Sequence, residues 1–144
     1  MHFYQKVKTM KRLLFILFIM FTNYASFSQH QPKVILHLQS SDTLVHKSIV
    51  NQISNLKKEI PNVAIELVCH GPGMDFLLKE KSRYINKIHK LNLKDVSFVG
   101  CEFTMGQKNI KKEDLVSFAV TVPYGMAEIV KKQQDNWLYV KLGF

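Results

Sequence analysis

The sequence lacks the motifs that identify several large classes of enzyme and metalloprotein. It contains neither GxGxxG nor GxxxxGKS/T, so no nucleotide-binding loop is indicated. It has no GxSxG nucleophile elbow, and its histidines form neither HxxxH nor HExxH. These absences argue against a Ser-His-Asp hydrolase and against a metalloenzyme. We therefore predict that the protein binds no metal and no cofactor.

Cysteine is also scarce, since only Cys69 and Cys101 occur. They are not spaced as CxxC, which excludes a thioredoxin-like redox pair and a zinc knuckle. The sequence has no interleaving of lysines and aromatic residues of the kind that grooves for single-stranded nucleic acid require. We interpret the lysine pairs at 57–58, 111–112 and 131–132 as solvated helix faces, and we predict no nucleic-acid partner.

Acidic residues are absent before Asp42, and this part of the chain has the order of a secretory signal. A basic stretch precedes the apolar run Leu13–Phe21, and the small polar segment Thr22–Gln29 follows it. Ser26 and Ser28 fit the small positions before a cleavage site. A membrane span needs about 20 apolar residues, roughly twice this run. We predict a signal peptide over 1–28, with Met10 as an alternative start, and a periplasmic or secreted protein that meets the membrane only during export.

The remaining residues, 29–144, predict a single α/β domain without repeats or linkers. Apolar runs predict strands at 34–38, 63–69, 96–101, 117–122 and 137–142. Helical spacing predicts helices from the capping segment 40–42 to residue 60, over 75–91 and over 126–133, with a short helix or turn within 104–114. This alternation predicts a five-stranded parallel sheet covered by helices on both faces.

Ligands bind beyond the carboxyl ends of the strands in such sheets, so function is sought there. Four segments follow predicted strands: Ser40–Asp42, His70–Gly73, Cys101–Met105 and Pro123–Gly125. A helix start would lower the pKa of the Cys101 thiol and leave its sulfur partly exposed, although buried cysteines often only pack. Cys69 is interpreted as a core residue. If the two strands are neighbours, a Cys69–Cys101 disulfide is an open alternative.

The segment His70–Gly73 is a tight turn between a strand and a helix. Its amides are candidates for holding an anion, and His70 is a candidate base or proton donor. A turn that only needs the backbone freedom of glycine is the open alternative.

Several segments form a recognisable pattern when they are taken in order. They are Lys33–Leu38, Val45–Leu56 with Asn51 and Asn55, Ile65–Gly73, Val96–Met105, Val122–Gly125 and Gln134–Lys141. In order and spacing they resemble the DsrE/DsrF-like family, and specifically its exported single-domain members, over about Lys33 to Lys141. The resemblance implies a three-layer α/β/α sandwich with a five-stranded parallel sheet over residues 29–144. It also implies a homo-oligomer, a trimer or a hexamer.

The resemblance further implies sulfur handling, in which a cysteine carries a persulfide between a donor and an acceptor protein. Cys101 matches the position of that cysteine and is the predicted carrier. The predicted binding residues around it are His70, Gly71, Gly73, Thr104 and Tyr124. Two hypotheses stay open on the residues: a sulfur carrier or sulfurtransferase, and a non-catalytic oligomeric module that binds a small anion or a protein partner.

Overall fold

A computed structural model of the chain describes residues 5–8, 10–12, 15 and 31–143. The chain divides into two units, Met1–His30 and Gln31–Phe144. In the first unit, residues 5–8 and 10–12 are helical. Within the described residues no helix has the length and apolar character needed to cross a membrane. The predicted cleavage after Ser28 lies outside the described residues, so the signal peptide stays a prediction.

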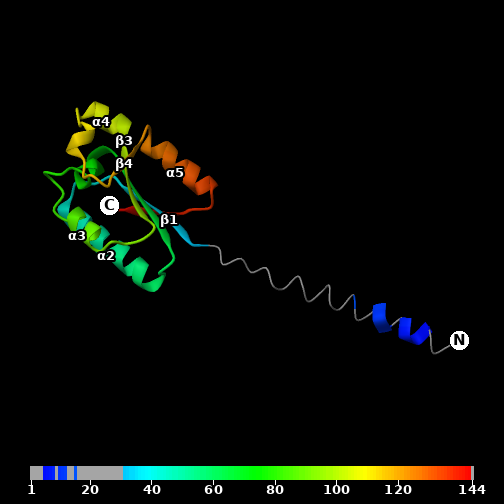
Figure 1. Ribbon diagram of the computed structural model, residues 1–144. Coiled ribbons are helices and arrows are strands. Elements are labelled where there is room, and N and C mark those ends of the chain that lie inside the picture. Colours follow the sequence, from blue (N-terminus) through cyan, green and yellow to red (C-terminus); the bar gives the residue numbers. More distant parts are fainter. Residues whose placement is uncertain (1–4, 9, 13–14, 16–30, 144) are drawn as a thin grey trace. The chain divides into compact units, whose positions relative to one another are not determined.

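The second unit alternates strands and helices along the chain (Figure 1). Its elements are β1 (Lys33–Leu38), α2 (Thr43–Glu59), β2 (Ala64–Cys69), the 3-10 helix η2 (Gly71–Phe76), α3 (Ile85–Lys90), β3 (Val96–Cys101), α4 (Glu102–Gln107), the 3-10 helix η3 (Lys112–Asp114), β4 (Val120–Val122), α5 (Gly125–Gln134) and β5 (Leu138–Leu142).

The five strands form one parallel sheet in the order β4-β3-β2-β1-β5. Helices α2 and α3 lie on one face of the sheet, and α5 lies on the other (Figure 1). The fold is therefore the three-layer α/β/α sandwich that the sequence predicted. Because every strand runs in the same direction, all five carboxyl ends meet at one edge of the sheet.

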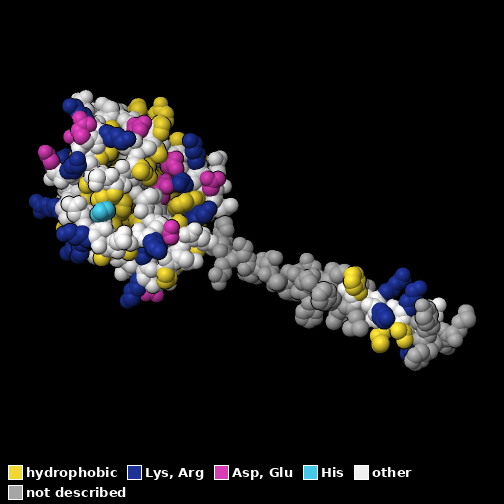
Figure 2. Space-filling view, in the orientation of Figure 1, with side chains coloured by type: hydrophobic (Ala, Val, Ile, Leu, Met, Phe, Trp, Pro, Cys, Tyr) yellow, Lys and Arg dark blue, Asp and Glu magenta, His cyan; other side chains and the backbone are white. Residues whose placement is uncertain are grey.

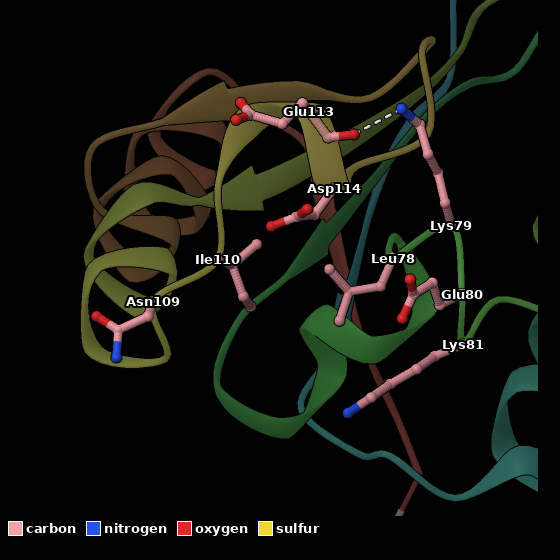
Figure 3. A pocket seen from close by; sticks show the side chains of 8 residues that line it. All are labelled: Leu78, Lys79, Glu80, Lys81, Asn109, Ile110, Glu113 and Asp114. Carbon is pink, nitrogen blue, oxygen red and sulfur yellow. Dashed lines mark hydrogen bonds between the residues drawn. The ribbon is translucent and has the colours of Figure 1, made fainter.

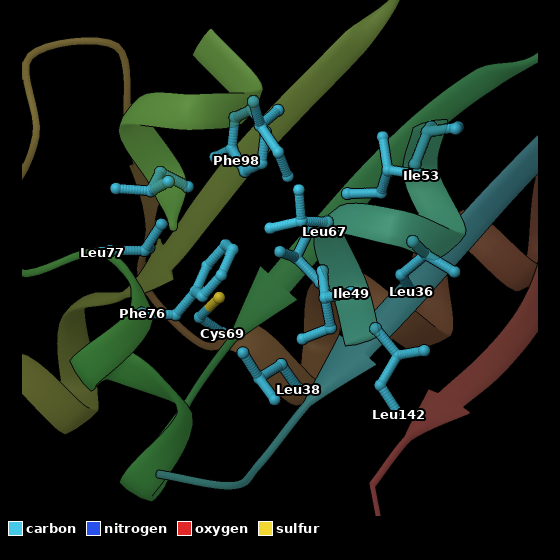
Figure 4. Packing of buried hydrophobic residues seen from close by; sticks show 14 of the residues in the cluster. Leu36, Leu38, Ile49, Ile53, Leu67, Cys69, Phe76, Leu77, Phe98 and Leu142 are labelled. Carbon is cyan, nitrogen blue, oxygen red and sulfur yellow. The ribbon is translucent and has the colours of Figure 1, made fainter. Parts of the chain in front are cut away.

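The main core lies between the sheet and the α2–α3 layer (Figure 4). Alternate residues of β1, such as Leu36 and Leu38, point into it together with Ile49 and Ile53 of α2. A smaller core under α5 contains Ile35, Val68, Val99 and Ile129. The three central strands, β1, β2 and β3, are thus largely buried on both faces, which explains why their sequences are continuous apolar runs.

The helix predicted over 75–91 is wrong in its first ten residues. Helix α3 covers only Ile85–Lys90, and its first amide donates a hydrogen bond to the Ser82 hydroxyl over 3.3 Å. The preceding residues instead pair with the segment before β4: the Val116 amide donates to Leu77 O, and the Lys79 amide donates to Asp114 O, both at 2.9 Å. These tertiary bonds occupy backbone groups that a helix would need, so the local helical pattern is overridden.

The strand predicted over 117–122 is also shorter, since β4 covers only Val120–Val122. The Ala119 amide donates to Val116 O over 3.0 Å and closes a turn there. Residues 117–119 therefore cannot join the sheet. The same turn brings Val116 beside Leu77. One contact therefore explains both the late start of the helix predicted over 75–91 and the short strand in place of 117–122.

Helix α5 is held on the sheet by an ion pair in addition to its apolar contacts. Lys132 Nζ lies 2.6 Å from Glu66 Oε2 of β2 and 3.6 Å from Glu128 Oε1, and it sits 4.5 Å from the centre of the Trp137 ring. Lys132 is thus only partly solvated, which corrects the interpretation of the 131–132 pair. Elsewhere, basic and acidic side chains are interspersed on the face that Figure 2 shows.

A close backbone approach fixes the start of η2. A Cβ atom on the buried Gly73 would lie 2.2 Å from Leu38 O, a contact that no side chain tolerates. The turn after β2 can therefore lie against the end of β1 only if residue 73 is glycine.

Gly73→Ala is expected to lower the free energy of unfolding by about 1–3 kcal/mol, because the backbone must move to relieve the overlap. Chemical denaturation of the purified protein measures this change. Gly106→Ala is the matched control, since a Cβ there meets no atom within 4 Å and residue 106 lies in α4. Equal stability of the two variants would contradict the proposed close contact.

Candidate functional site

The register between β2 and β3 places the two cysteines on opposite faces of the sheet. Cys69 pairs with Gly100, so His70 and Cys101 are the next residues along two neighbouring strands. Side chains alternate between the faces of a sheet, so Cys101 points away from the side that Cys69 occupies. A Cβ on Gly100 would contact Met74 and Leu77, whereas a Cβ on Gly125 would contact the Cβ atoms of Cys101 and His70.

Cys69 belongs to the main core, where its sulfur is not accessible to a reactant. Its side chain is fully buried among apolar residues, including Phe76 (Figure 4). Burial raises the pKa of the Cys69 thiol, so it stays protonated. Both cysteines are free, and their positions on opposite faces of the sheet exclude the disulfide that the sequence left open.

Cys101 lies at the end of β3, as predicted, and directly before α4, which begins two residues earlier than the short helix or turn predicted within 104–114. Its exposed fraction is only 4%, less than the partly exposed sulfur expected from the sequence, because the first residue of α5 packs against it. The Gly125 amide donates a hydrogen bond to Cys101 Sγ over 3.3 Å. Burial acts to raise the pKa of the Cys101 thiol. The bonds from the Gly125, Thr104 and Phe103 amides and the Thr104 hydroxyl outweigh it and lower the pKa below its ordinary value.

The Thr104 hydroxyl has a defined orientation in this network. It accepts a hydrogen bond from the Gly71 amide over 3.1 Å, so its own proton is free to point to Cys101. Thr104 is buried, and its hydroxyl links the turn after β2 to the sulfur on β3. Thr104 is therefore placed to donate a hydrogen bond to Cys101 Sγ.

A cavity of about 330 Å³ opens beside Cys101, so the small exposed fraction does not isolate the sulfur. Four of the five predicted binding residues line it: His70, Gly71, Thr104 and Tyr124. Gly73 does not line it, because it is buried against β1. The rest of the lining comes from Gln39, Phe103, Gln107, Gly125 and Met126.

The amides of the turn at residues 70–73 are not free to hold an anion. The Gly71 amide donates to Thr104, the Gly73 amide donates to His70 O over 3.0 Å, and Pro72 has no amide hydrogen. The anion-binding prediction therefore has no support from these two glycines. What the turn provides is the position of His70 and of the Thr104 hydroxyl.

His70 connects the cavity to residues that the sequence did not single out. His70 Nε2 lies 2.5 Å from His37 Nε2 on β1, and His37 Nδ1 lies 2.8 Å from the Tyr139 hydroxyl on β5. Burial lowers the pKa of His70. Burial, His70 and Lys141 together lower the pKa of His37 to about 4. Both imidazoles are therefore neutral at pH 7.

Sequence reasoning missed these two residues for a physical reason. His37 and Tyr139 become neighbours only because β5 pairs with β1, and sequence patterns do not determine strand order. Gln39, Gln107 and Met126 carried no distinctive signal either. Gly125 did have one, because it follows a strand and a proline.

A separate cleft of about 410 Å³ lies away from Cys101 (Figure 3). Both of its lysines already have partners: Lys79 Nζ donates to Glu113 O over 2.5 Å, and Lys81 lies 3.1 Å from Asp75. No cysteine, serine, threonine or histidine is among the residues that line it. Across the described residues, no three or more His, Cys, Asp or Glu side chains converge on a metal-sized site.

Comparison with known proteins agrees with this architecture. The model of the DsrE/DsrF-like family matches residues 18–142. Among solved structures, the chain is similar to the protein of unknown function MTH1491 from Methanobacterium thermoautotrophicum, with 24% sequence identity and a TM-score of 0.71. That alignment covers 76% of this chain and 98% of the other, and it supports the fold alone. The comparison with curated proteins gave no significant match.

The family match spans the whole sheet, from β1 to the end of β5, together with the cavity beside Cys101. The chain belongs to the DsrE/DsrF-like family.

Proposed function

We propose that Cys101 carries sulfane sulfur as a persulfide, and that the protein does so outside the cytoplasm. The observation that carries the proposal is the set of hydrogen bonds to Cys101 Sγ, which favours the thiolate at the wall of an open cavity. A thiolate is the reactive form in sulfur exchange. The basic and apolar pattern of residues 1–28 supports the location.

The proposed transfer is a pair of exchange reactions without net oxidation. The Cys101 thiolate attacks the outer sulfur of a donor persulfide, a new S–S bond forms on Cys101, and the donor leaves as a thiolate. An acceptor thiolate then attacks the outer sulfur on Cys101 and restores the Cys101 thiolate. The donors that stabilise the Cys101 thiolate also make it a good leaving group in the second step.

Mass spectrometry of the intact protein after incubation with a small persulfide donor tests this chemistry. The wild type is expected to gain one sulfur, about 32 Da, and to lose it to an added thiol. Cys101→Ser is expected to gain nothing. Cys69→Ser is the matched control and is expected to load like the wild type, because Cys69 is buried on the other face of the sheet. Loading that depends on Cys69 would overturn the assignment.

Thr104→Val tests the hydrogen bonds to the sulfur. Loss of the hydroxyl is expected to raise the Cys101 pKa by about one unit or more. A hydrogen bond to a charged group contributes about 1.5–3 kcal/mol, and one pKa unit corresponds to about 1.4 kcal/mol. The rate of iodoacetamide alkylation against pH measures the pKa, and at pH values below that pKa the rate should fall about tenfold. Thr104→Ser keeps the hydroxyl and should retain the wild-type profile; an unchanged profile in the valine variant would contradict the role of Thr104.

The mouth of the cavity supports the proposal of a homo-oligomer. Phe103, Tyr124 and Met126 line the cavity, yet 56%, 61% and 52% of their respective surfaces are exposed. Exposed apolar side chains grouped at one opening are typical of an interface. We propose that a second copy of the chain covers this opening and completes the walls of the cavity.

Met126→Glu is expected to reduce the oligomer to a monomer, because it places a charge in the proposed interface. Light scattering coupled to size-exclusion chromatography measures the mass in solution. Leu44→Glu is the control, since Leu44 is also exposed but lies at the start of α2 on the other face of the sheet. A wild-type monomer at all concentrations, or an unchanged oligomer in the Met126 variant, would contradict the proposal.

A further inference from the structure

Three side chains form a continuous hydrogen-bonded chain across the carboxyl end of the sheet. Tyr139 on β5 bonds His37 on β1, and His37 bonds His70 just after β2. His70 lines the Cys101 cavity, whereas Tyr139 is 40% exposed on the edge strand. This series of hydrogen bonds therefore begins at the cavity beside Cys101 and ends at solvent on β5, away from the mouth of the cavity.

The separation of 2.5 Å between the two Nε2 atoms requires one proton between them. A neutral imidazole has one N–H donor and one acceptor nitrogen, so only two arrangements are consistent. In the first, His70 donates to His37, and His37 Nδ1–H donates to Tyr139. In the second, every bond is reversed: Tyr139 donates to His37 Nδ1, and His37 Nε2–H donates to His70.

The two arrangements differ at the nitrogen that is available to the cavity. Within the described part of the chain, His70 Nδ1 forms no hydrogen bond. It is also not among the buried polar atoms that lack a partner, so it is accessible. In the first arrangement Nδ1 is an acceptor, and in the second it carries a proton. The low pKa values of both imidazoles keep the pair neutral, so the relevant change is one of tautomer and not of charge. Lys141, opposite His37 on β5, is the charged neighbour that opposes protonation of His37.

We infer that Tyr139, His37 and His70 form a proton relay between the Cys101 cavity and solvent at β5. The Cys101 proton reaches His70 Nδ1, either through a water molecule or through the substrate sulfur in the cavity. The Nε2 proton of His70 moves to His37 Nε2, the Nδ1 proton of His37 moves to Tyr139, and the Tyr139 hydroxyl proton passes to solvent. One proton crosses, no charge remains on the relay, and both imidazoles exchange tautomer.

The inference rests on the proposed persulfide chemistry, which is the source of the proton. The relay accounts for the protons that this chemistry releases and takes up. When Cys101 starts as the thiol, its proton leaves before the thiolate attacks the donor persulfide. Loading then follows Cys–SH + R–S–SH → Cys–S–SH + R–S⁻ + H⁺ and releases one proton, with the donor leaving as a thiolate. Unloading to an acceptor thiolate leaves a Cys101 thiolate, which takes one proton back. The two half-reactions therefore drive the relay in opposite directions and restore the starting tautomers. An exit at β5 also leaves a path for the proton while a partner covers the mouth of the cavity.

Nitrogen-15 NMR of the histidine rings tests the relay without any sulfur donor, because protonated and unprotonated ring nitrogens have well-separated shifts. As pH rises through the Cys101 pKa, the protonated nitrogen of His70 is expected to change from Nε2 to Nδ1, and that of His37 from Nδ1 to Nε2. Cys101→Ser should abolish both changes. Tyr139→Phe, which removes one hydroxyl from an exposed residue, should prevent both changes, because the two tautomers are coupled through the shared proton.

Single-turnover loading from a small persulfide donor supplies the functional readout. Tyr139→Phe is expected to slow loading at pH 7 about tenfold and to change the solvent isotope effect, since general-base assistance contributes about 10²- to 10⁴-fold and His70 itself remains. Tyr84→Phe, a similar change outside the site, should leave both unchanged. The relay is overturned if the tautomers do not change in the wild type, or if Tyr139→Phe loads at the wild-type rate with an unchanged isotope effect. Tautomer exchange in a protein that takes up no sulfur would retain the relay and reject the persulfide function alone.

Discussion

The pairing of Cys69 with Gly100 between β2 and β3 is the constraint on which the site depends. It places His70 beside Cys101 at the end of the sheet, and it directs Cys69 into the core on the opposite face. A shift of one residue would reverse every side chain of β3 and turn Cys101 away from the cavity into the main core. The register is fixed by burial on both faces, since Phe98 packs in one core and Val99 in the other. Core packing therefore determines which cysteine is available for chemistry.

The second requirement is a hydrogen-bond donor close to Cys101 Sγ, and α5 supplies it. The Lys132–Glu66 ion pair and Ile129 hold the helix on the sheet, which brings the Gly125 amide to 3.3 Å from Cys101 Sγ. Glycine allows this close approach, because a Cβ there would lie 3.2 Å from both Cys101 Cβ and Val68 Cγ1 and its neighbours would have to move slightly. Burial alone would protonate the thiol, as it does for Cys69. The pKa values of the two thiols thus shift in opposite directions because hydrogen-bond donors surround Cys101 Sγ, and not because the two side chains differ in burial.

Sequence patterns predicted the parts of this arrangement that local chemistry encodes. The β3 bounds, the start of a helix after Cys101 and the cavity residues His70, Gly71, Thr104 and Tyr124 follow from strand ends in a parallel sheet. The helix over 75–91 failed because Leu77 and Val116 form a tertiary bond that periodicity cannot report. His37 and Tyr139 could not be predicted, since their contact depends on β5 returning to pair with β1. Gly73 looked like a binding glycine but meets a packing requirement that only the Leu38 carbonyl reveals.

Under the proposed persulfide function and relay, the site would separate the path of sulfur from the path of protons. In the proposed function, sulfur is exchanged in the cavity that Phe103, Tyr124 and Met126 line, and the second copy proposed there would exclude water from it. Exclusion of water strengthens the hydrogen bonds to the thiolate, because a low dielectric weakens competition from solvent. The same exclusion would trap the proton that loading releases. A route through neutral imidazoles to β5 removes that conflict, because it moves a proton without placing a lasting charge beside the sulfur.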